Sequence, residues 1–172
     1  MIIYTDGSCH GNPGKGGWAL YCPETGYEDS GFSTKTTNNR MELTAIMEAM
    51  KLQGVKTIIT DSRYCHDGCT KWVQGWARKN WKTSTGTDVK NIDLWKNIFS
   101  MLHKKIEFKW VRAHDTNDHN IHVDKLANNA INMQGVTTDQ SRREYLVTMA
   151  TTLKAQLTKI EEEIVQIDSK CK

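Results

Sequence analysis

The chain has 172 residues, of which 38% are hydrophobic and 25% are charged, and its formal net charge is +3. This length can bury one ordinary hydrophobic core and leaves little room for a second large domain. The charge permits a nucleic-acid partner without requiring one, and it excludes a strongly basic or strongly acidic protein.

The last 36 residues hold six basic and six acidic side chains, so the basic surplus belongs to residues 1–136. No apolar run approaches the ~20 residues of a membrane span, so no membrane association is expected. The five cysteines are scattered, and no secretory segment precedes them. That pattern is typical of a reducing compartment, and we expect an intracellular protein, cytoplasmic or nuclear.

Short runs of β-branched and aromatic residues predict five strands, of which the first three are joined by tight turns. Apolar residues at helical spacing predict the helical regions. The strands are expected at 1–8, 18–22, 27–33, 56–60 and 106–111, and the helical regions at about 39–53, 62–82, 91–102 and 123–133. Three consecutive strands followed by crossovers indicate an α/β fold with a mixed five-stranded sheet covered by helices.

A different pattern occupies the end of the chain. A capping box at Ser141–Glu144 precedes an unbroken heptad seam, whose residues are Leu146, Ala150, Leu153, Leu157, Ile160, Ile164, Ile167 and Cys171. We therefore predict a domain at 1–136 and a long helical, coiled-coil extension at 137–172, with a homo-oligomer or a partner helix bound through residues 141–172. A parallel dimer would oppose Glu163 and Asp168, so antiparallel pairing, a higher oligomer, a partner's helix and folding back on the main domain all stay open.

Four carboxylates stand at positions suited to holding a metal. Asp6 and Asp61 end predicted strands that could be neighbours in the sheet, whereas Glu42 and Asp124 are expected in the first turns of helices, where the helix dipole favours the ionised form. Mg²⁺ prefers such hard oxygen ligands, and two ions need about four carboxylates. Acids near helix starts are also ordinary capping residues, and periodicity does not show that these four converge.

The blocks around these acids, taken in order, resemble type 1 ribonuclease H. The resemblance runs from residue 1 to about residue 133. The blocks are Thr5-Asp6-Gly7-Ser8, Gly11-Asn12-Pro13-Gly14, Thr36-Thr37-Asn38-Asn39-Arg40-Met41-Glu42-Leu43, Thr60-Asp61-Ser62-Arg63-Tyr64, Val89-Lys90-Asn91-Ile92-Asp93-Leu94-Trp95, Trp110-Val111-Arg112-Ala113-His114 and Asp124-Lys125-Leu126-Ala127.

The resemblance implies an RNase H-like fold and endonucleolytic cleavage of the RNA strand of RNA/DNA hybrids, with 5′-phosphate and 3′-hydroxyl ends. It implies two Mg²⁺ ions as cofactors, with Mn²⁺ as a possible substitute. By resemblance, Asp6, Glu42, Asp61 and Asp124 are the metal ligands. His114, on a loop, is expected to assist proton transfer or product release.

The resemblance also assigns the substrate-binding residues. Asn12, Asn38 and Asn39 are expected to contact the minor groove, where the 2′-hydroxyl distinguishes RNA from DNA. Thr37, Arg78 and Asn91 are expected to hold a phosphate of the DNA strand, and Trp72 to lie against a deoxyribose. The basic segment around Trp72, Trp76 and Trp81 resembles the basic protrusion of bacterial members, although tryptophans at such spacing also pack helices together.

The chain departs from the family pattern in two places. Arg63 stands where bacterial members commonly carry glutamine, and the segment from Asp115 to His122 holds additional acids and histidines. Two other hypotheses compete with an active nuclease. One is a non-catalytic hybrid-binding module presented by the tail, which the complete set of carboxylates disfavours, and the other is an integrase or transposase of related fold.

Overall fold

The computed structural model describes residues 1–102, 105–113 and 117–132, together with positions 147, 150, 151, 154, 155, 157, 158, 160–162 and 164. By its internal contacts the chain divides into two units, Met1–Thr138 and Asp139–Lys172. The predicted domain boundary between residues 136 and 137 lies outside the described residues and stays a prediction. Within the described part of the chain, no helix combines the length and apolar character needed to cross a membrane.

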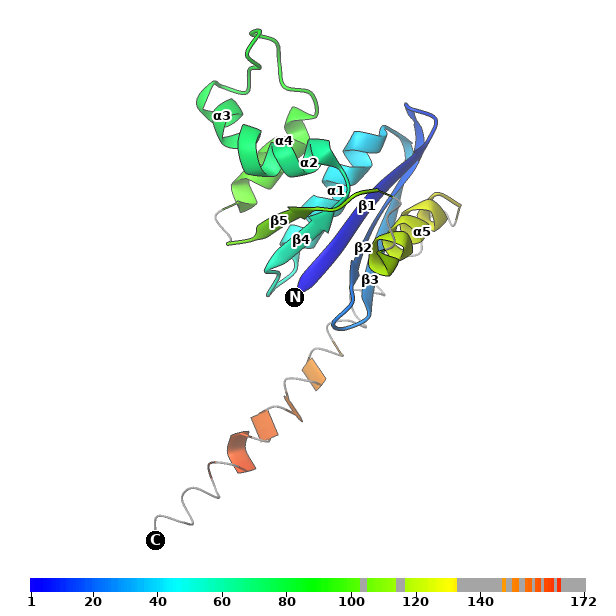
Figure 1. Ribbon diagram of the computed structural model, residues 1–172, viewed down its shortest axis with the longest axis vertical. Coiled ribbons are helices and arrows are strands. Elements are labelled where there is room, and N and C mark those ends of the chain that lie inside the picture. The colour runs from blue at the N-terminus through cyan, green and yellow to red at the C-terminus, as the bar shows by residue number, and fades with distance from the viewer. Residues whose placement is uncertain are drawn as a thin grey trace. The chain divides into compact units, whose positions relative to one another are not determined.

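The first unit is built on a five-stranded mixed sheet (Figure 1). The strands are β1 (Ile2–His10), β2 (Gly14–Cys22), β3 (Tyr27–Thr36), β4 (Thr57–Thr60) and β5 (Glu107–Trp110). Their order is β3-β2-β1-β4-β5; β2 pairs antiparallel with β1 and β3, whereas β4 pairs parallel with β1 and β5. This topology confirms the predicted mixed sheet of an RNase H-like α/β fold.

The parallel pairing of β1 with β4 brings two predicted site residues to one edge of the sheet. Thr5 pairs with Thr60, and the next residue of each strand is an aspartate. Because the two strands run in the same direction, the residues that follow this last pair also lie side by side, although β1 itself continues to His10. Asp6 and Asp61 are therefore neighbours, as the sequence predicted.

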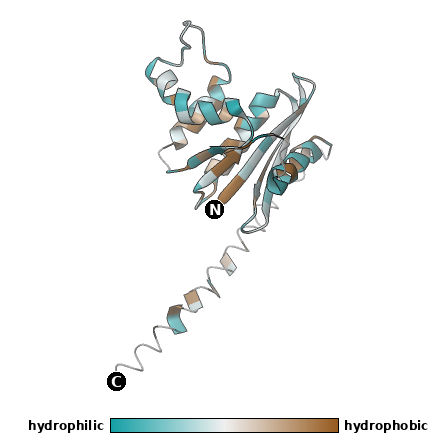
Figure 2. Cartoon of the chain, in the orientation of Figure 1, coloured by the Kyte–Doolittle hydropathy of each residue, from teal (hydrophilic) through white to brown (hydrophobic). Residues whose placement is uncertain are grey.

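Helices cover both faces of this sheet. They are α1 (Asn38–Lys51), α2 (Arg63–Asp67), the π-helix η1 (Gly68–Trp72), α3 (Val73–Arg78), α4 (Ile92–Met101) and α5 (Asp118–Asn132). Figure 1 shows α1 and α5 on opposite faces, and Figure 2 shows apolar residues in the central strands β1 and β4. The predicted carboxylates Asp6 and Asp61 lie at the middle of β1 and just after the end of β4.

The core has one layer on each side of the sheet. On the α5 side, Val123 and Ala127 pack with Tyr4, Ala19 and Ile59. The face of α1 that packs on the other side is buried at its apolar positions, which are Met41, Leu43, Ala45, Ile46, Ala49 and Met50. Both helices thus bury the faces that their sequence periodicity predicts.

The predicted starts of α1 and α5 were wrong. Both helices begin earlier than predicted, so Glu42 and Asp124 lie further from the helix starts. The N-cap of α1 is Thr37, so Glu42 lies beyond the first turn. α5 begins at Asp118, five residues earlier than predicted, because the side chain of Asn117 accepts hydrogen bonds from the backbone N–H groups of His119 and Asn120. Asp124 is therefore well inside its helix, and the predicted placement of both acids in helix first turns does not hold.

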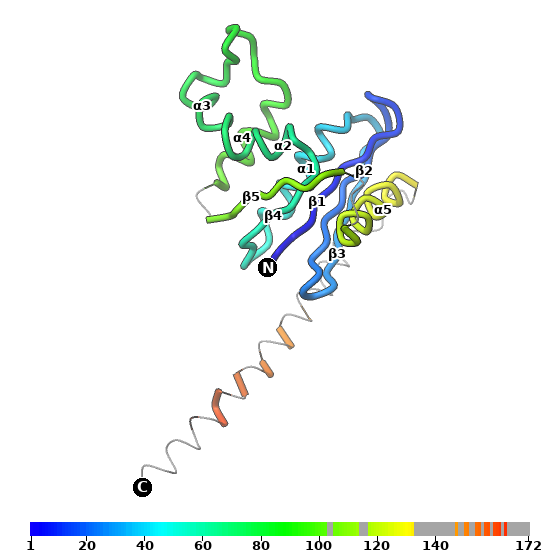
Figure 3. Tube along the Cα trace, viewed as in Figure 1, coloured from blue at the N-terminus to red at the C-terminus, as the bar shows by residue number. Residues whose placement is uncertain are grey.

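The tryptophan-bearing segment is helical, as predicted, but divided into three pieces. The Trp72 and Trp76 rings lie 5.7 Å apart, Trp76 lies 5.4 Å from Trp95, and Trp81 lies 5.8 Å from Phe99. The chain then loops away from the sheet between α3 and α4 (Figure 3). Trp76 and Trp81 therefore pack the protrusion onto α4, whereas Trp72 keeps 38% of its surface exposed.

The second unit contains only separate described positions. Each of them is in helical conformation. Val147, Leu157, Ile160 and Ile164 are each more than half exposed. The rest of the predicted helix, including its capping box, lies outside the described residues, so one continuous long helix stays a prediction.

Candidate active site

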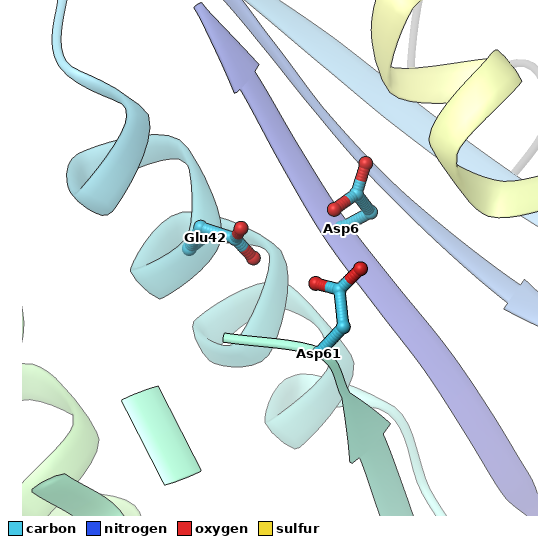
Figure 4. Close-up of side chains that lie close together, drawn as sticks. All are labelled: Asp6, Glu42 and Asp61. Atoms are coloured by element: carbon cyan, nitrogen blue, oxygen red, sulfur yellow. The ribbon is translucent and has the colours of Figure 1, made fainter. Parts of the chain in front are cut away.

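Three carboxylates from distant parts of the sequence meet beside the middle of β1 and the carboxyl end of β4. Asp6 extends from β1, Asp61 follows β4, and Glu42 extends from α1 toward both (Figure 4). One oxygen from each residue lies within 4.8 Å of the others. Asp6 and Glu42 are buried, and Asp61 is half-buried. Three acidic oxygens this close could hold a cation, and each of them comes from a different part of the fold.

Gly7 allows Glu42 to reach the cluster. A Cβ atom at position 7 would lie 2.1 Å from the backbone nitrogen of Glu42 and 2.5 Å from the carbonyl carbon of Met41. Both are backbone atoms, so a larger residue would push α1 away from β1. Because glycine has no side chain, α1 can lie close to β1 at this point, and this close approach brings Glu42 to Asp6.

The cluster is electrostatically unfavourable by itself. Burial, followed by the charges of Asp61 and Asp124, raises the pKa of Asp6 from 3.8 to about 7. Burial, followed by the charges of Asp6 and Asp61, raises the pKa of Glu42 well above its usual value, although Asn38 and the Gly7 backbone oppose this. Closely placed like charges and burial both favour the protonated acid. A bound cation would remove this penalty.

Asp124, the fourth predicted ligand, lies beside Asp6. Its charge is close enough to contribute to the raised pKa of Asp6. Asp124 is half-buried on the face of α5 that packs against β1 and β2. The structure thus brings all four predicted carboxylates into one neighbourhood, with Asp124 on the Asp6 side. His114, the predicted proton-transfer residue, lies outside the described residues.

The predicted groove-contacting residues gather at the start of α1. The backbone N–H of Asn38 donates to Asn12 Oδ1 at 3.4 Å, and Asn38 Nδ2 donates to Glu42 Oε1 at 3.4 Å. Thr37 is the N-cap residue of α1, and Asn39 is exposed in its first turn. The polar segment that is expected to contact substrate is therefore bonded directly to a predicted metal ligand.

The predicted DNA-strand residues lie on the protrusion and at the start of α4. Arg78 ends α3 and is exposed. Asn91 has a left-handed backbone, with φ of 58°, and its Nδ2 donates to the Tyr64 hydroxyl oxygen at 3.3 Å. Trp95 Nε1 donates to the same oxygen at 2.8 Å. Tyr64, which the sequence did not single out, therefore orients Asn91.

Arg63, which replaces the more common glutamine, packs against Trp110. Its guanidinium carbon lies 3.5 Å from the ring centroid, a cation–π contact. Trp110 in turn donates its Nε1–H to the backbone oxygen of Asp61 at 2.8 Å. Arg63 is thereby held as an exposed positive charge beside the carboxylate cluster.

Comparison with known proteins identifies the family. The sequence profile of RNase H matches residues 1–132. The chain belongs to the type 1 ribonuclease H family. A ribonuclease HI of Rickettsia prowazekii is 46% identical over 133 residues, which cover 74% of this chain and 88% of that protein. A ribonuclease H of Novosphingobium aromaticivorans is 48% identical over 134 residues, which cover 74% of this chain and 94% of that protein.

A solved structure supports the same assignment. The crystal structure of LC9-RNase H1, described as a type 1 RNase H with the type 2 active-site motif, superposes with a TM-score of 0.67 at 30% identity, covering 80% of this chain and 74% of that one. The chain is thus an enzyme of the ribonuclease H class, a hydrolase, and its acidic cluster suggests the metal binding typical of ribonucleases H.

Two asparagines of α5 were missed by the sequence interpretation. Asn120 Nδ2 donates to Asp61 Oδ2 at 3.1 Å, and Asn128 Nδ2 donates to Asp124 Oδ1 at 3.0 Å. The available signal was their spacing, because both stand four residues from Asp124 and share its helix face.

Proposed function

We propose that the protein is an endoribonuclease that hydrolyses the RNA strand of RNA/DNA hybrids and leaves 5′-phosphate and 3′-hydroxyl ends. The observation that carries the proposal is the meeting of Asp6, Glu42 and Asp61 within 4.8 Å in a chain of the ribonuclease H family. The relatives named ribonuclease H, at 46% and 48% identity, support the same reaction.

The residues present fit divalent metal ions. All the donors are carboxylate oxygens, which suit Mg²⁺ or Mn²⁺ and not a thiophilic metal. Glu42 Oε2 is buried and has no hydrogen-bond partner in the described part of the structure, and a buried carboxylate oxygen without a donor is costly unless a cation binds it. We assign Asp6, Glu42, Asp61 and Asp124 as the ligands of two Mg²⁺ ions, with Mn²⁺ as a substitute.

When bound, the ions would supply the activation of a water molecule and the stabilisation of the departing oxygen. The protein supplies the geometry. Asp6 and Glu42, held by β1 and α1, and Asp61 and Asp124, held by β4 and α5, fix the positions at which phosphate oxygens can approach. His114 is assigned to proton transfer or product release, in keeping with its position ten residues before Asp124.

Substrate selection falls to two groups of side chains. Asn12, in the turn between β1 and β2, and Asn38 and Asn39, at the start of α1, are assigned to the minor groove. Thr37, Arg78 and Asn91 are assigned to a phosphate of the DNA strand, and Trp72 to a deoxyribose. Supporting this division, the bidentate pair of Arg40 and Asp93, at 2.6 and 2.9 Å, ties the first turn of α1 to the first turn of α4. This ion pair therefore connects the helix that carries Asn38 and Asn39 to the helix that Asn91 precedes.

A cleavage assay tests the activity. The full chain is incubated with Mg²⁺ and labelled RNA/DNA hybrid, duplex RNA or duplex DNA. Cleavage confined to the RNA of the hybrid is the expected result, and an intact hybrid would refute the proposal. Asp6→Asn should abolish cleavage while retaining hybrid binding, since the groove and phosphate contacts lie on other residues.

We further propose that residues 141–172 form one helix that pairs with a second copy or with a partner's helix. Exposed Leu157, Ile160 and Ile164 support this, because they fall on the predicted heptad seam. Light scattering on the full chain and on a version ending near residue 133 tests the pairing. A larger assembly for the full chain is expected. Equal subunit counts for both would rule out self-association through the tail and leave a partner's helix as the remaining form, to be sought by mixing with candidate helices.

A further inference from the structure

One face of α5 carries a polar stripe directed at the carboxylate cluster. Asn120, Asp124 and Asn128 are spaced by four residues, so they lie above one another on a single helix face. The two asparagines bond to different acids, Asn120 to Asp61 and Asn128 to Asp124. α5 thus contacts two of the four carboxylates through amide groups.

The orientation of the Asn128 amide is determined by its partners. Its Nδ2 donates to Asp124 Oδ1 at 3.0 Å and to the Asp124 backbone oxygen at 2.9 Å. Its Oδ1 accepts from Ser8 Oγ at 2.7 Å. The opposite orientation would place Oδ1 against two acceptor oxygens, which cannot donate. Ser8 stands two residues after Asp6 on β1, so this network ties Asp124 to the strand that carries Asp6.

The Asn120 amide donates to Asp61, but its own oxygen is left without a hydrogen bond from any described residue. It is 3% exposed, and its Nδ2 donates to Asp61 Oδ2 at 3.1 Å. Its Oδ1 is buried without a hydrogen-bond partner among the described residues. Leaving a buried acceptor unsatisfied costs about 1–3 kcal/mol. An apolar residue would avoid that cost, so the amide is retained here for the contact with Asp61.

We infer that Asn120 and Asn128 are positioning residues for metal binding: each holds one oxygen of a carboxylate, Asp61 or Asp124, so that the other oxygen is presented to the cation. This inference rests on the metal-binding part of the proposed function. Groups that bond to metal ligands fix the orientation of those ligands, and their loss typically weakens metal affinity about 10- to 100-fold. The same scale is expected for each asparagine.

Titration calorimetry with Mn²⁺, in the absence of nucleic acid, tests the inference. Asn120→Ala and Asn128→Ala should each weaken Mn²⁺ binding about 10-fold or more. Asn129→Ala is the matched control, because Asn129 is an exposed neighbour on the same helix. The Mn²⁺ affinity of this variant should stay within twofold of the wild type. In cleavage assays the two positioning variants should need a higher metal concentration and recover most of the wild-type rate at saturation.

Thermal melting in a chelator accompanies each titration. If an alanine variant fails to fold, Asn120→Leu and Asn128→Leu replace it, because leucine keeps the shape of asparagine and removes its hydrogen bonds. A folded variant that binds Mn²⁺ within twofold of the wild type, or a wild type that does not bind Mn²⁺, would overturn the inference. A wild type that binds Mn²⁺ and leaves the hybrid intact would refute the proposed activity alone.

Discussion

Replacing Asp6 by asparagine should stabilise the metal-free protein while removing its activity. Asp6 is the acid whose pKa rises from 3.8 to about 7, through burial and the charges of Asp61 and Asp124. Because the folded pKa lies above the unfolded one, the contribution of this group to the free energy of unfolding is full below pH 3.8 and is lost as pH rises to about 7. Asparagine at position 6 is neutral at every pH, so the variant does not lose this stability as the pH rises.

The size of the effect follows from the pKa difference. A difference of about 3 corresponds to about 4 kcal/mol, at about 1.4 kcal/mol for each pH unit. About 2 kcal/mol of this is already lost at pH 5, so the stability advantage of Asp6→Asn should widen by about 2 to 3 kcal/mol between pH 5 and pH 8.

Urea denaturation in a chelator, for both proteins at both pH values, measures this widening. Adding Mg²⁺ should then stabilise the wild type at pH 8 and have much less effect on the variant, because a ligand stabilises the state that binds it. An advantage for Asp6→Asn that does not change with pH, or a variant less stable than the wild type at pH 8, would show that Asp6 is not held at a penalty in the cluster.

Three further substitutions examine the scaffold of the site. Gly7→Ala should destabilise the protein by about 1–3 kcal/mol and weaken Mn²⁺ binding, because the new Cβ meets the backbone of Glu42. Thermal melting measures the first effect and calorimetry the second. Unchanged stability together with unchanged Mn²⁺ affinity would contradict the close approach of α1 and β1. Gly75→Ala, where a Cβ meets nothing within 4 Å inside α3, should instead stabilise by about 0.5–1 kcal/mol in urea denaturation, and a loss of stability would show that the helix needs this glycine. Tyr64→Phe should lower the free energy of unfolding by about 1–3 kcal/mol, because the buried Trp95 indole loses its acceptor. It should also weaken hybrid binding in a filter or anisotropy assay. Hybrid affinity equal to that of the wild type would show that Tyr64 does not position Asn91.

Much of the fold could be predicted because local patterns agree with the tertiary structure. The runs Ile2–Thr5 and Thr57–Thr60 are short and rich in residues that favour strands, and an aspartate follows each run, so Asp6 and Asp61 could be expected to lie close together. The start of α5 could not be predicted in the same way. The segment from Asn117 to His122 is polar, and the cap by Asn117 is a local bond that periodicity does not reveal.

The interior of the site depends on contacts between distant residues. Ser8 and Asn128 are separated by 120 positions, and no local pattern indicates that these two residues bond to each other. The approach of Glu42 to Gly7 is likewise a matter of tertiary packing. Sequence blocks could thus identify the acids through their resemblance to a family, whereas the groups that orient those acids required the three-dimensional arrangement.

The position of α5 in the chain has a consequence for biosynthesis. Asp124 and both asparagines arrive on the last helix of the first unit, after all five strands have been made. A nascent chain that has emerged only as far as β5 contains Asp6, Glu42 and Asp61, but it lacks the fourth acid and the helix face that packs on Tyr4, Ala19 and Ile59. We therefore expect the complete set of four carboxylates to form only after α5 has been made and has docked on the sheet.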